Sequence, residues 1–214
     1  MTTFASWLRK SPLIAILRGV EPREVADIAE GLIETGILII EVPLNSPEPL
    51  ESIRRLAAEC GNRALVGAGT VMRSEDVDAI RSAGGKLIVT PHAQAAVVRR
   101  AKELGLLTVP GFFSPTEAFA MIDAGADALK LFPAEAASPK VLGALRAVLP
   151  RTMPVLPVGG IDAGGIPAWL KAGASGFGIG SALYKPGLGR AAVTAKARLL
   201  VAALKPGQAG EAQR

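Results

Sequence analysis

Lys130 is the residue whose type and position point most directly to chemistry, because it interrupts the apolar segment 128–132. That segment has the composition of a buried β-strand, where an ammonium group costs free energy unless it is paired, reaches water or loses its proton. A neutral, partly desolvated lysine amine attacks carbonyl carbons and forms Schiff bases. The alternative is a lysine at a strand end whose amine extends to water.

Three more polar residues stand in or just after similar apolar segments: Arg18, Glu41 and Thr70. Side chains alternate between the two faces of a strand, so Lys130 and Glu41 are expected to point away from the large aliphatic residues beside them. Taken alone, Glu41 is equally well explained as a charge partner of Arg18 or Lys130. We expect all four to converge, and a buried polar network without a chemical role tends to cost more than an apolar core. Convergence therefore favours a catalytic site.

Two glycine-rich turns supply a second part of the predicted site. Gly159 and Gly160 follow one late apolar segment, and Gly180 ends the next one, just before Ser181. Glycines let an anion approach backbone N–H groups, and the turns after the last two strands of a (β/α)8 barrel commonly bind phosphate. The two turns together predict a phosphate-binding end.

Eight short apolar segments, each bounded by Gly, Pro or polar turn residues, are predicted to be the strands that position these groups. They are residues 13–18, 38–42, 64–68, 87–90, 107–110, 128–132, 154–158 and 176–180. Segments with helical spacing lie between them, and several end in a glycine, which supplies the left-handed residue that stops a helix. These glycines are Gly36, Gly84, Gly105, Gly125 and Gly173.

Strand–helix units in this order, with right-handed crossovers, close most simply into an α/β fold of the (β/α)8 TIM-barrel type with short loops. A doubly wound open sheet is the alternative, but no Gly-x-Gly-x-x-Gly turn follows the first predicted strand. We predict a single domain over residues 1–204, in which Phe4, Trp7 and Leu8 form a short helix that covers the barrel bottom. Residues 205–214 are predicted to be a disordered tail.

Composition narrows the expected partners and compartment. The 214 residues are 50% hydrophobic with a net charge of +5, and no basic stripe with interleaved aromatics points to nucleic acid. One cysteine excludes an intramolecular disulfide, and one histidine without a Cys/His cluster argues against zinc. No segment has the pattern of a signal peptide or a membrane span, so we expect a cytoplasmic protein. That histidine, His92, follows a predicted strand, and its role stays open.

Six segments, taken in order, carry a recognisable pattern. They are residues 13–19, 41–47, 67–71, 128–133, 158–161 and 180–181. Together they resemble the 2-keto-3-deoxy-6-phosphogluconate/phosphogalactonate aldolase family, with similarity over roughly residues 8–204. The resemblance implies a class I aldolase on a small barrel that forms a homotrimer and uses neither metal nor cofactor. In this family pattern Lys130 matches the Schiff-base lysine and Glu41 the general acid/base.

The same resemblance extends to positions that bind substrate. The matched positions are Arg18, Thr70, Pro91 and Phe132 near the pyruvate carboxylate, and Gly159, Gly160, Gly180 and Ser181 in the phosphate pocket. Asn45 and Val158 match positions that bear on substrate specificity, where phosphogluconate-type members usually carry Arg and Thr. The pattern therefore looks more like the phosphogalactonate branch.

The implied reaction is cleavage of 2-dehydro-3-deoxy-6-phospho-D-galactonate to pyruvate and D-glyceraldehyde 3-phosphate. One alternative is the gluconate epimer, or both epimers, as the substrate. A phosphosugar epimerase or isomerase is more distant, since ribulose-phosphate-type epimerases use metal-binding His and Asp residues and this chain has only His92. A third possibility is a non-catalytic barrel that binds phosphosugars.

Overall fold

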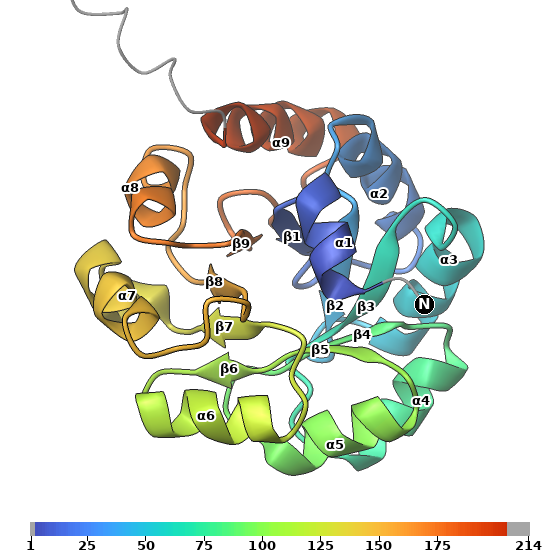
Figure 1. The fold of residues 1–214 in the computed structure, drawn as a ribbon. Helices are drawn as coiled ribbons and strands as arrows, with labels where there is room; N and C mark the ends of the chain where they lie inside the picture. The colour runs from blue at the N-terminus through green and yellow to red at the C-terminus, as the bar shows by residue number, and fades with distance from the viewer. Residues whose placement is uncertain (1–2, 205–214) are drawn as a thin grey trace, which may run out of the picture.

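Parallel strands alternate with helices along the chain, and the helices form a ring around the strands (Figure 1). The computed structural model describes residues 3–204, so the tail predicted to be disordered, residues 205–214, lies outside the described residues. The strands are β1 (Leu13–Ile16), β2 (Ile39–Pro43), β3 (Leu65–Gly69), β4 (Leu87–Val89), β5 (Leu107–Val109), β6 (Gly111–Phe112), β7 (Leu129–Leu131), β8 (Val155–Pro157) and β9 (Phe177–Ile179). The α/β class with a parallel sheet agrees with the prediction.

Helices occupy the segments between the strands. They are α1 (Phe4–Lys10), α2 (Val25–Glu34), α3 (Pro49–Cys60), α4 (Glu75–Ser82), α5 (Ala95–Glu103), α6 (Pro115–Asp123), the 3-10 helix η1 (Ala134–Ala136), α7 (Pro139–Arg146), α8 (Ile166–Lys171) and α9 (Arg190–Ala203). Each predicted stop glycine follows a helix and has a positive φ, between 72° and 98°. These residues confirm the predicted helix ends, because a left-handed residue turns the chain away while the last carbonyl groups still find partners.

The strands pair in two parallel sheets. One has the order β5-β4-β3-β2-β1-β9, and the other has the order β6-β7-β8. The predicted strand over residues 107–110 ends one residue early, because Pro110 has no N–H for the ladder and separates β5 from β6. Its carbonyl nevertheless accepts a hydrogen bond from the Lys130 N–H at 2.8 Å. A parallel bridge between Val158 and Gly178 connects the ends of β8 and β9.

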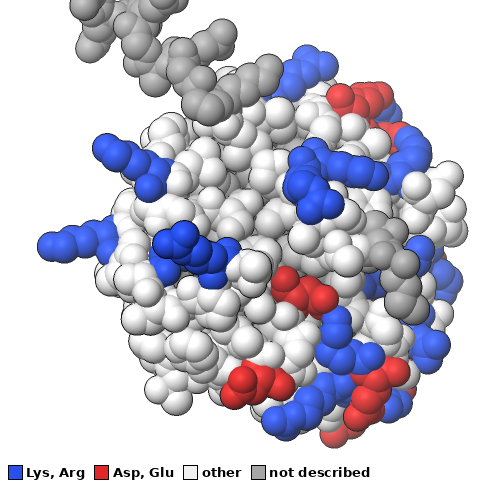
Figure 2. Space-filling model, viewed as in Figure 1, with Lys and Arg blue, Asp and Glu red and all other residues white. Residues whose placement is uncertain are grey.

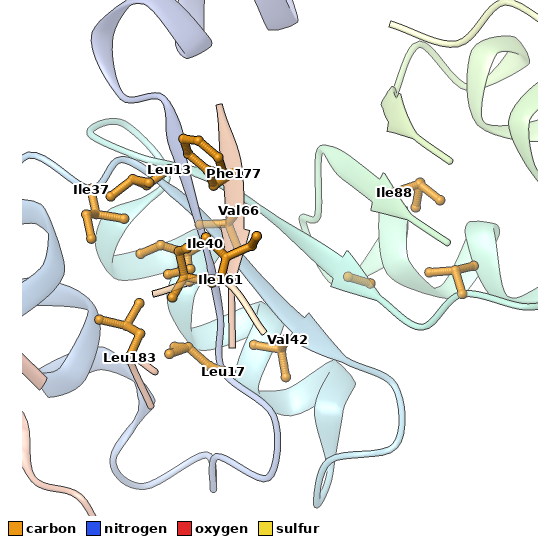
Figure 3. Packing of buried hydrophobic residues seen from close by; sticks show 14 of the residues in the cluster. Leu13, Leu17, Ile37, Ile40, Val42, Val66, Ile88, Ile161, Phe177 and Leu183 are labelled. Carbon is orange, nitrogen blue, oxygen red and sulfur yellow. The ribbon is translucent and has the colours of Figure 1, made fainter. Parts of the chain in front are cut away.

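An outer apolar layer fills the space between strands and helices. It includes Leu13, Ile40, Val66, Ile88 and Phe177, which are all at most 2% exposed (Figure 3). Burial of side chains of this size contributes about 1.5–3 kcal/mol each to stability. Because side chains alternate along a strand, the residues between these positions face inwards.

A smaller inner layer lies on the opposite face of the strands, and α1 packs against it. Ile14 and Ile39 belong to this layer near the starts of their strands. Phe4 and Leu8 of α1 are buried in the same cluster, with Trp7 packed beside them. The inner layer is therefore filled at the N-terminal ends of the strands, and polar groups on its face lie towards the C-terminal ends.

Charged side chains are spread over the face that carries α1. In Figure 2 the Lys and Arg side chains on this face are separated by uncharged surface and by acidic groups. Surface ion pairs join neighbouring helices, for example Arg100 with Asp78 at 2.6 Å. Among the helices of residues 3–204, none has the length and apolar character needed to span a membrane.

Candidate active site

Lys130 lies in the middle of β7 with only 6% of its surface exposed. Leu129 and Leu131 belong to the outer layer and Ala128 to the inner layer, so strand alternation turns Lys130 inwards, as predicted. Its Nζ lies 4.7 Å from the centroid of the Phe132 ring. Burial lowers the pKa of the Lys130 amine, while the nearby Glu41 carboxylate acts in the opposite direction. A lowered pKa makes the free amine available as a nucleophile.

Glu41 lies on the inner face of β2 and is 2% exposed. Burial raises the pKa of its carboxyl to about 7, against the opposing effects of the Lys130 and Arg18 charges. Its Oε2 atom is buried without a hydrogen-bond partner among residues 3–204. A pKa near 7 lets the group both give and take protons near neutral pH, which is the property of a general acid/base.

Gly69, at the end of β3, provides the space that the Glu41 carboxylate occupies. A Cβ atom at position 69 would overlap Oε2 of Glu41, so a larger residue cannot stand there without moving the carboxylate. Sequence reasoning missed this role, because a glycine at a strand end has the same pattern whether it permits a turn or a close approach.

Arg18 connects the loops that follow three neighbouring strands. Its Nη1 donates to Asn45 Oδ1 at 2.5 Å, and its Nη2 donates to Thr70 Oγ1 at 3.4 Å. Thr70 has a φ of 55°, an uncommon conformation for a β-branched residue, and such strain concentrates at functional sites. The prediction that strand one ends at Arg18 is wrong by two residues. β1 ends at Ile16, and the chain turns away at Gly19, whose φ is 81°.

One cavity of about 130 Å³ brings most of the predicted residues together. Its lining includes Arg18, Lys130, Phe132, Val158, Gly159, Gly160, Gly180 and Ser181. Five residues that were not predicted also line it: Ile16, Glu135, Ile161, Gly178 and Ala182. The cavity lining thus combines the cationic side chains of Arg18 and Lys130 with the two glycine turns. Glu41, Thr70, Asn45 and Pro91 are not among its lining residues, although the first three lie close to Lys130 or Arg18.

The glycine turns present unpaired backbone donors. Gly159 and Gly160 have φ values of 109° and 64°, in the region that favours glycine. Within the described part of the chain, the backbone N–H groups of Gly160, Ile161 and Ser181 donate to no other residue. Free N–H groups at a concave turn attract anions.

Pro91 and His92 follow β4 and lie beside Gly111 instead of in the cavity. A Cβ atom at Gly111 would come within 2.5 Å of the Pro91 carbonyl carbon. The backbone carbonyl of His92 accepts a hydrogen bond from Thr90 Oγ1 at 2.5 Å, while the imidazole is exposed. A role for Pro91 in substrate binding stays a prediction, and the role of His92 stays open.

Comparison with known proteins places this site in a family. The profile of the family described as "Aldolase: KDPG and KHG aldolase" matches residues 4–196, most of the chain. The chain belongs to this family.

Relatives within the KDPG and KHG aldolases differ in their similarity to this chain. The 2-dehydro-3-deoxy-6-phosphogalactonate aldolase of Escherichia coli is 45% identical over 85% of this chain and 88% of that protein. The 2-dehydro-3-deoxy-phosphogluconate aldolase of Zymomonas mobilis is 30% identical over 80% of this chain and 81% of that protein. A solved structure described as "Native KDPGal structure" has 43% identity and a TM-score of 0.89, covering 91% of this chain and 94% of that one.

Proposed function

We propose that this protein is a class I aldolase that cleaves 2-dehydro-3-deoxy-6-phospho-D-galactonate to pyruvate and D-glyceraldehyde 3-phosphate. The observation that carries the proposal is the buried Lys130 amine, with its lowered pKa, in a cavity that is also lined by Arg18 and by turns with free backbone amides. Family membership supports the same reaction class.

The Lys130 amine adds to the C2 carbonyl of the keto acid, and loss of water leaves a protonated imine. The C3–C4 bond then breaks, and its electron pair moves towards the imine nitrogen to give an enamine of pyruvate. Proton return to C3 and hydrolysis of the imine release pyruvate and restore the amine. The cationic imine accepts the electrons, so the step needs no external oxidant or reductant.

Glu41 is the proposed proton carrier. It removes the C4 hydroxyl proton as the C3–C4 bond breaks, which converts C4 into the aldehyde carbon, and it returns a proton to the enamine. A carboxyl whose pKa is raised to about 7 can alternate between the two forms that these steps need. Arg18 and Thr70, already in contact, are the proposed donors to the substrate carboxylate.

The amides of the glycine turns are the proposed phosphate seat. Contacts to a phosphate remote from the reacting bond contribute binding energy that holds the substrate in the cavity. Gly159, Gly160, Gly180 and Ser181 line the cavity at this end, which supports the assignment made from the sequence.

We further propose that the two sheets form one closed (β/α)8 barrel and a single domain over residues 1–204. The Val158–Gly178 bridge at one junction supports closure, and so does the hydrogen bond from Lys130 N–H to the Pro110 carbonyl at the other. The homotrimer is a prediction from the family resemblance, and the cytoplasmic location is a prediction from the sequence pattern.

The phosphogluconate epimer is the second candidate substrate, because both epimers share every group except the configuration at C4. Val158 lies in the cavity and Asn45 holds Arg18, and both positions differ from the phosphogluconate pattern. Higher identity to the phosphogalactonate relative, 45% against 30%, supports the same choice. Cleavage of the two C4 epimers side by side tests it, and a preference for the gluconate epimer would reverse it.

Trapping tests the Schiff base directly. Pyruvate with borohydride is expected to add a stable mass at Lys130, located by peptide mass spectrometry. Lys130→Ala is expected to lose both the adduct and cleavage, whereas the exposed Lys140 provides the control variant Lys140→Ala, which keeps both. Full cleavage by Lys130→Ala would refute the mechanism. Loss of activity with a chelator would favour the epimerase alternative instead.

A further inference from the structure

Glu135 is a cavity residue that neither the sequence nor the mechanism above accounts for. It lies in η1, in the loop that follows the strand of Lys130. Its side chain reaches across to the glycine turn after β8. A Cβ atom at Gly159 would overlap the Glu135 carboxylate, and one at Gly160 would come within 2.6 Å of its Cγ.

Glu135 is the one carboxylate among the residues that line this cavity. The other polar groups there are donors: the Lys130 amine, the Arg18 guanidinium and the backbone N–H groups of the turns. Ser181 adds a hydroxyl, which can donate or accept a hydrogen bond. Within residues 3–204, the Glu135 carboxylate takes part in no hydrogen bond or ion pair. A charged acceptor in this position is therefore available to a donor on the ligand.

The carboxylate lies beside the proposed anion seat and does not occupy it. Its atoms lie against the Cα side of Gly159 and Gly160, yet the Gly160 N–H does not donate to it. An acceptor inside the seat itself would take those amide protons. The amides thus remain free for phosphate, and Glu135 lines the same cavity as these turns and Lys130.

We propose that Glu135 is a specificity-determining residue that accepts a hydrogen bond from the C5 hydroxyl of the substrate, the carbon next to the phosphate-bearing carbon. The inference rests on the proposed function, which fixes C2 at Lys130 and the phosphate at the glycine turns. Glu41 takes the C4 hydroxyl, and Val158 offers no acceptor in its side chain. Glu135 is left as the carboxylate acceptor for the remaining hydroxyl.

Glu135 is an exposed residue, so water can replace a missing donor and the discrimination is expected to be moderate. We expect about a tenfold preference in kcat/KM for an aldehyde that carries this hydroxyl. The preference is expected to act mainly through the KM of the aldehyde, because Glu135 does not touch the bonds that form or break.

The aldol direction supplies a matched pair of probes. Pyruvate is condensed with D-glyceraldehyde 3-phosphate, and separately with 3-phosphooxypropanal, which lacks only the hydroxyl. The unaltered protein is expected to prefer the first aldehyde about tenfold. Glu135→Ala is expected to reduce the preference to about twofold or less by losing activity towards the first aldehyde alone, and Glu135→Gln to keep part of it. Glu59→Ala, an exposed carboxylate on α3, is the control and keeps the full preference.

The outcomes separate this inference from the function on which it rests. If the unaltered protein forms the pyruvate adduct at Lys130 but shows no preference between the aldehydes, the role of Glu135 is refuted and the aldolase stands. Equal losses towards both aldehydes in Glu135→Ala and Glu135→Gln also refute it, and a gain towards both would mean that Glu135 repels phosphate. No adduct and no condensation would refute the aldolase itself.

Discussion

The two ends of the cavity are built in different ways. Around Lys130 and Glu41, buried side chains from β7 and β2, which belong to different sheets, perturb each other, and burial dominates the pKa shift of both groups. At the other end, backbone N–H groups of exposed or half-buried turns are the main polar groups. The reactivity of the groups around Lys130 therefore depends on the burial and charge of their surroundings. Anion binding at the distal end depends instead on the backbone conformation of the turns. Substitutions at the reactive end should therefore lower mainly kcat, whereas substitutions at the distal end should raise mainly KM.

The largest effect is expected at the reactive end. Glu41→Gln keeps the shape of the side chain but removes the proton carrier, and kcat should fall by about 100- to 10,000-fold. Steady-state cleavage kinetics measure the change, with Glu59→Gln as a control on the protein surface. A fall below about threefold would show that Glu41 is not the proton carrier.

The same substitution should change how stability depends on pH. The folded-state pKa of Glu41 is raised to about 7 from a usual value of 4.5, so the folded protein holds a proton that the unfolded chain has released. Stability from this group is fully present below pH 4.5 and declines as pH rises towards 7, by roughly 3 kcal/mol in total. Urea unfolding across this range should show the decline in the unaltered protein and a smaller one in Glu41→Gln. Parallel pH profiles for the two proteins would contradict the raised pKa.

Gly69→Ala tests the fit between the strands at the reactive end. The new methyl group overlaps the Glu41 carboxylate, so the carboxylate must move. Activity should fall by about 10- to 100-fold, because displacement of a catalytic group by about 1 Å is costly. Gly143→Ala on α7 is the matched control, since nothing lies within 4 Å of the added Cβ. Equal activity of the two variants would mean that Glu41 tolerates displacement.

The smallest effect is expected at the distal end. Gly160→Ala places a side chain at a φ of 64° and should disturb the amide seat. The expected result is a rise of about fivefold in the KM of the phosphorylated substrate with kcat nearly unchanged, because the seat binds the ground state and the transition state alike. A fall in kcat with unchanged KM would remove the proposed distinction between the two ends.

The inward direction of Lys130 and Glu41 was predictable, because strand alternation fixes it once the large aliphatic neighbours are assigned to the helix layer. The helix ends were predictable from their glycines for a similarly local reason. The position of Arg18 was harder to predict. The apolar pattern continues to Leu17, whereas β1 ends at Ile16 because the chain turns at Gly19. The position of Glu135 and the space at Gly69 were not predictable, because the first depends on a contact between two loops and the second on a contact between two strands, each pair well separated in the sequence. The hydrophobic periodicity of a sequence shows which face of an element is buried, but it does not show which distant residues are in contact.

The packing of α1 against the inner layer has a kinetic consequence. Phe4 and Leu8 help to fill the interior at the N-terminal ends of the strands, so we expect ligands to reach the site from the C-terminal ends. In the proposed mechanism, pyruvate is still joined covalently to Lys130 when the phosphorylated aldehyde forms. The aldehyde must therefore leave first, and the pyruvate last. In such an ordered release, pyruvate competes with the substrate for the free enzyme, whereas glyceraldehyde 3-phosphate inhibits by recombining with the enamine that its own departure has left behind.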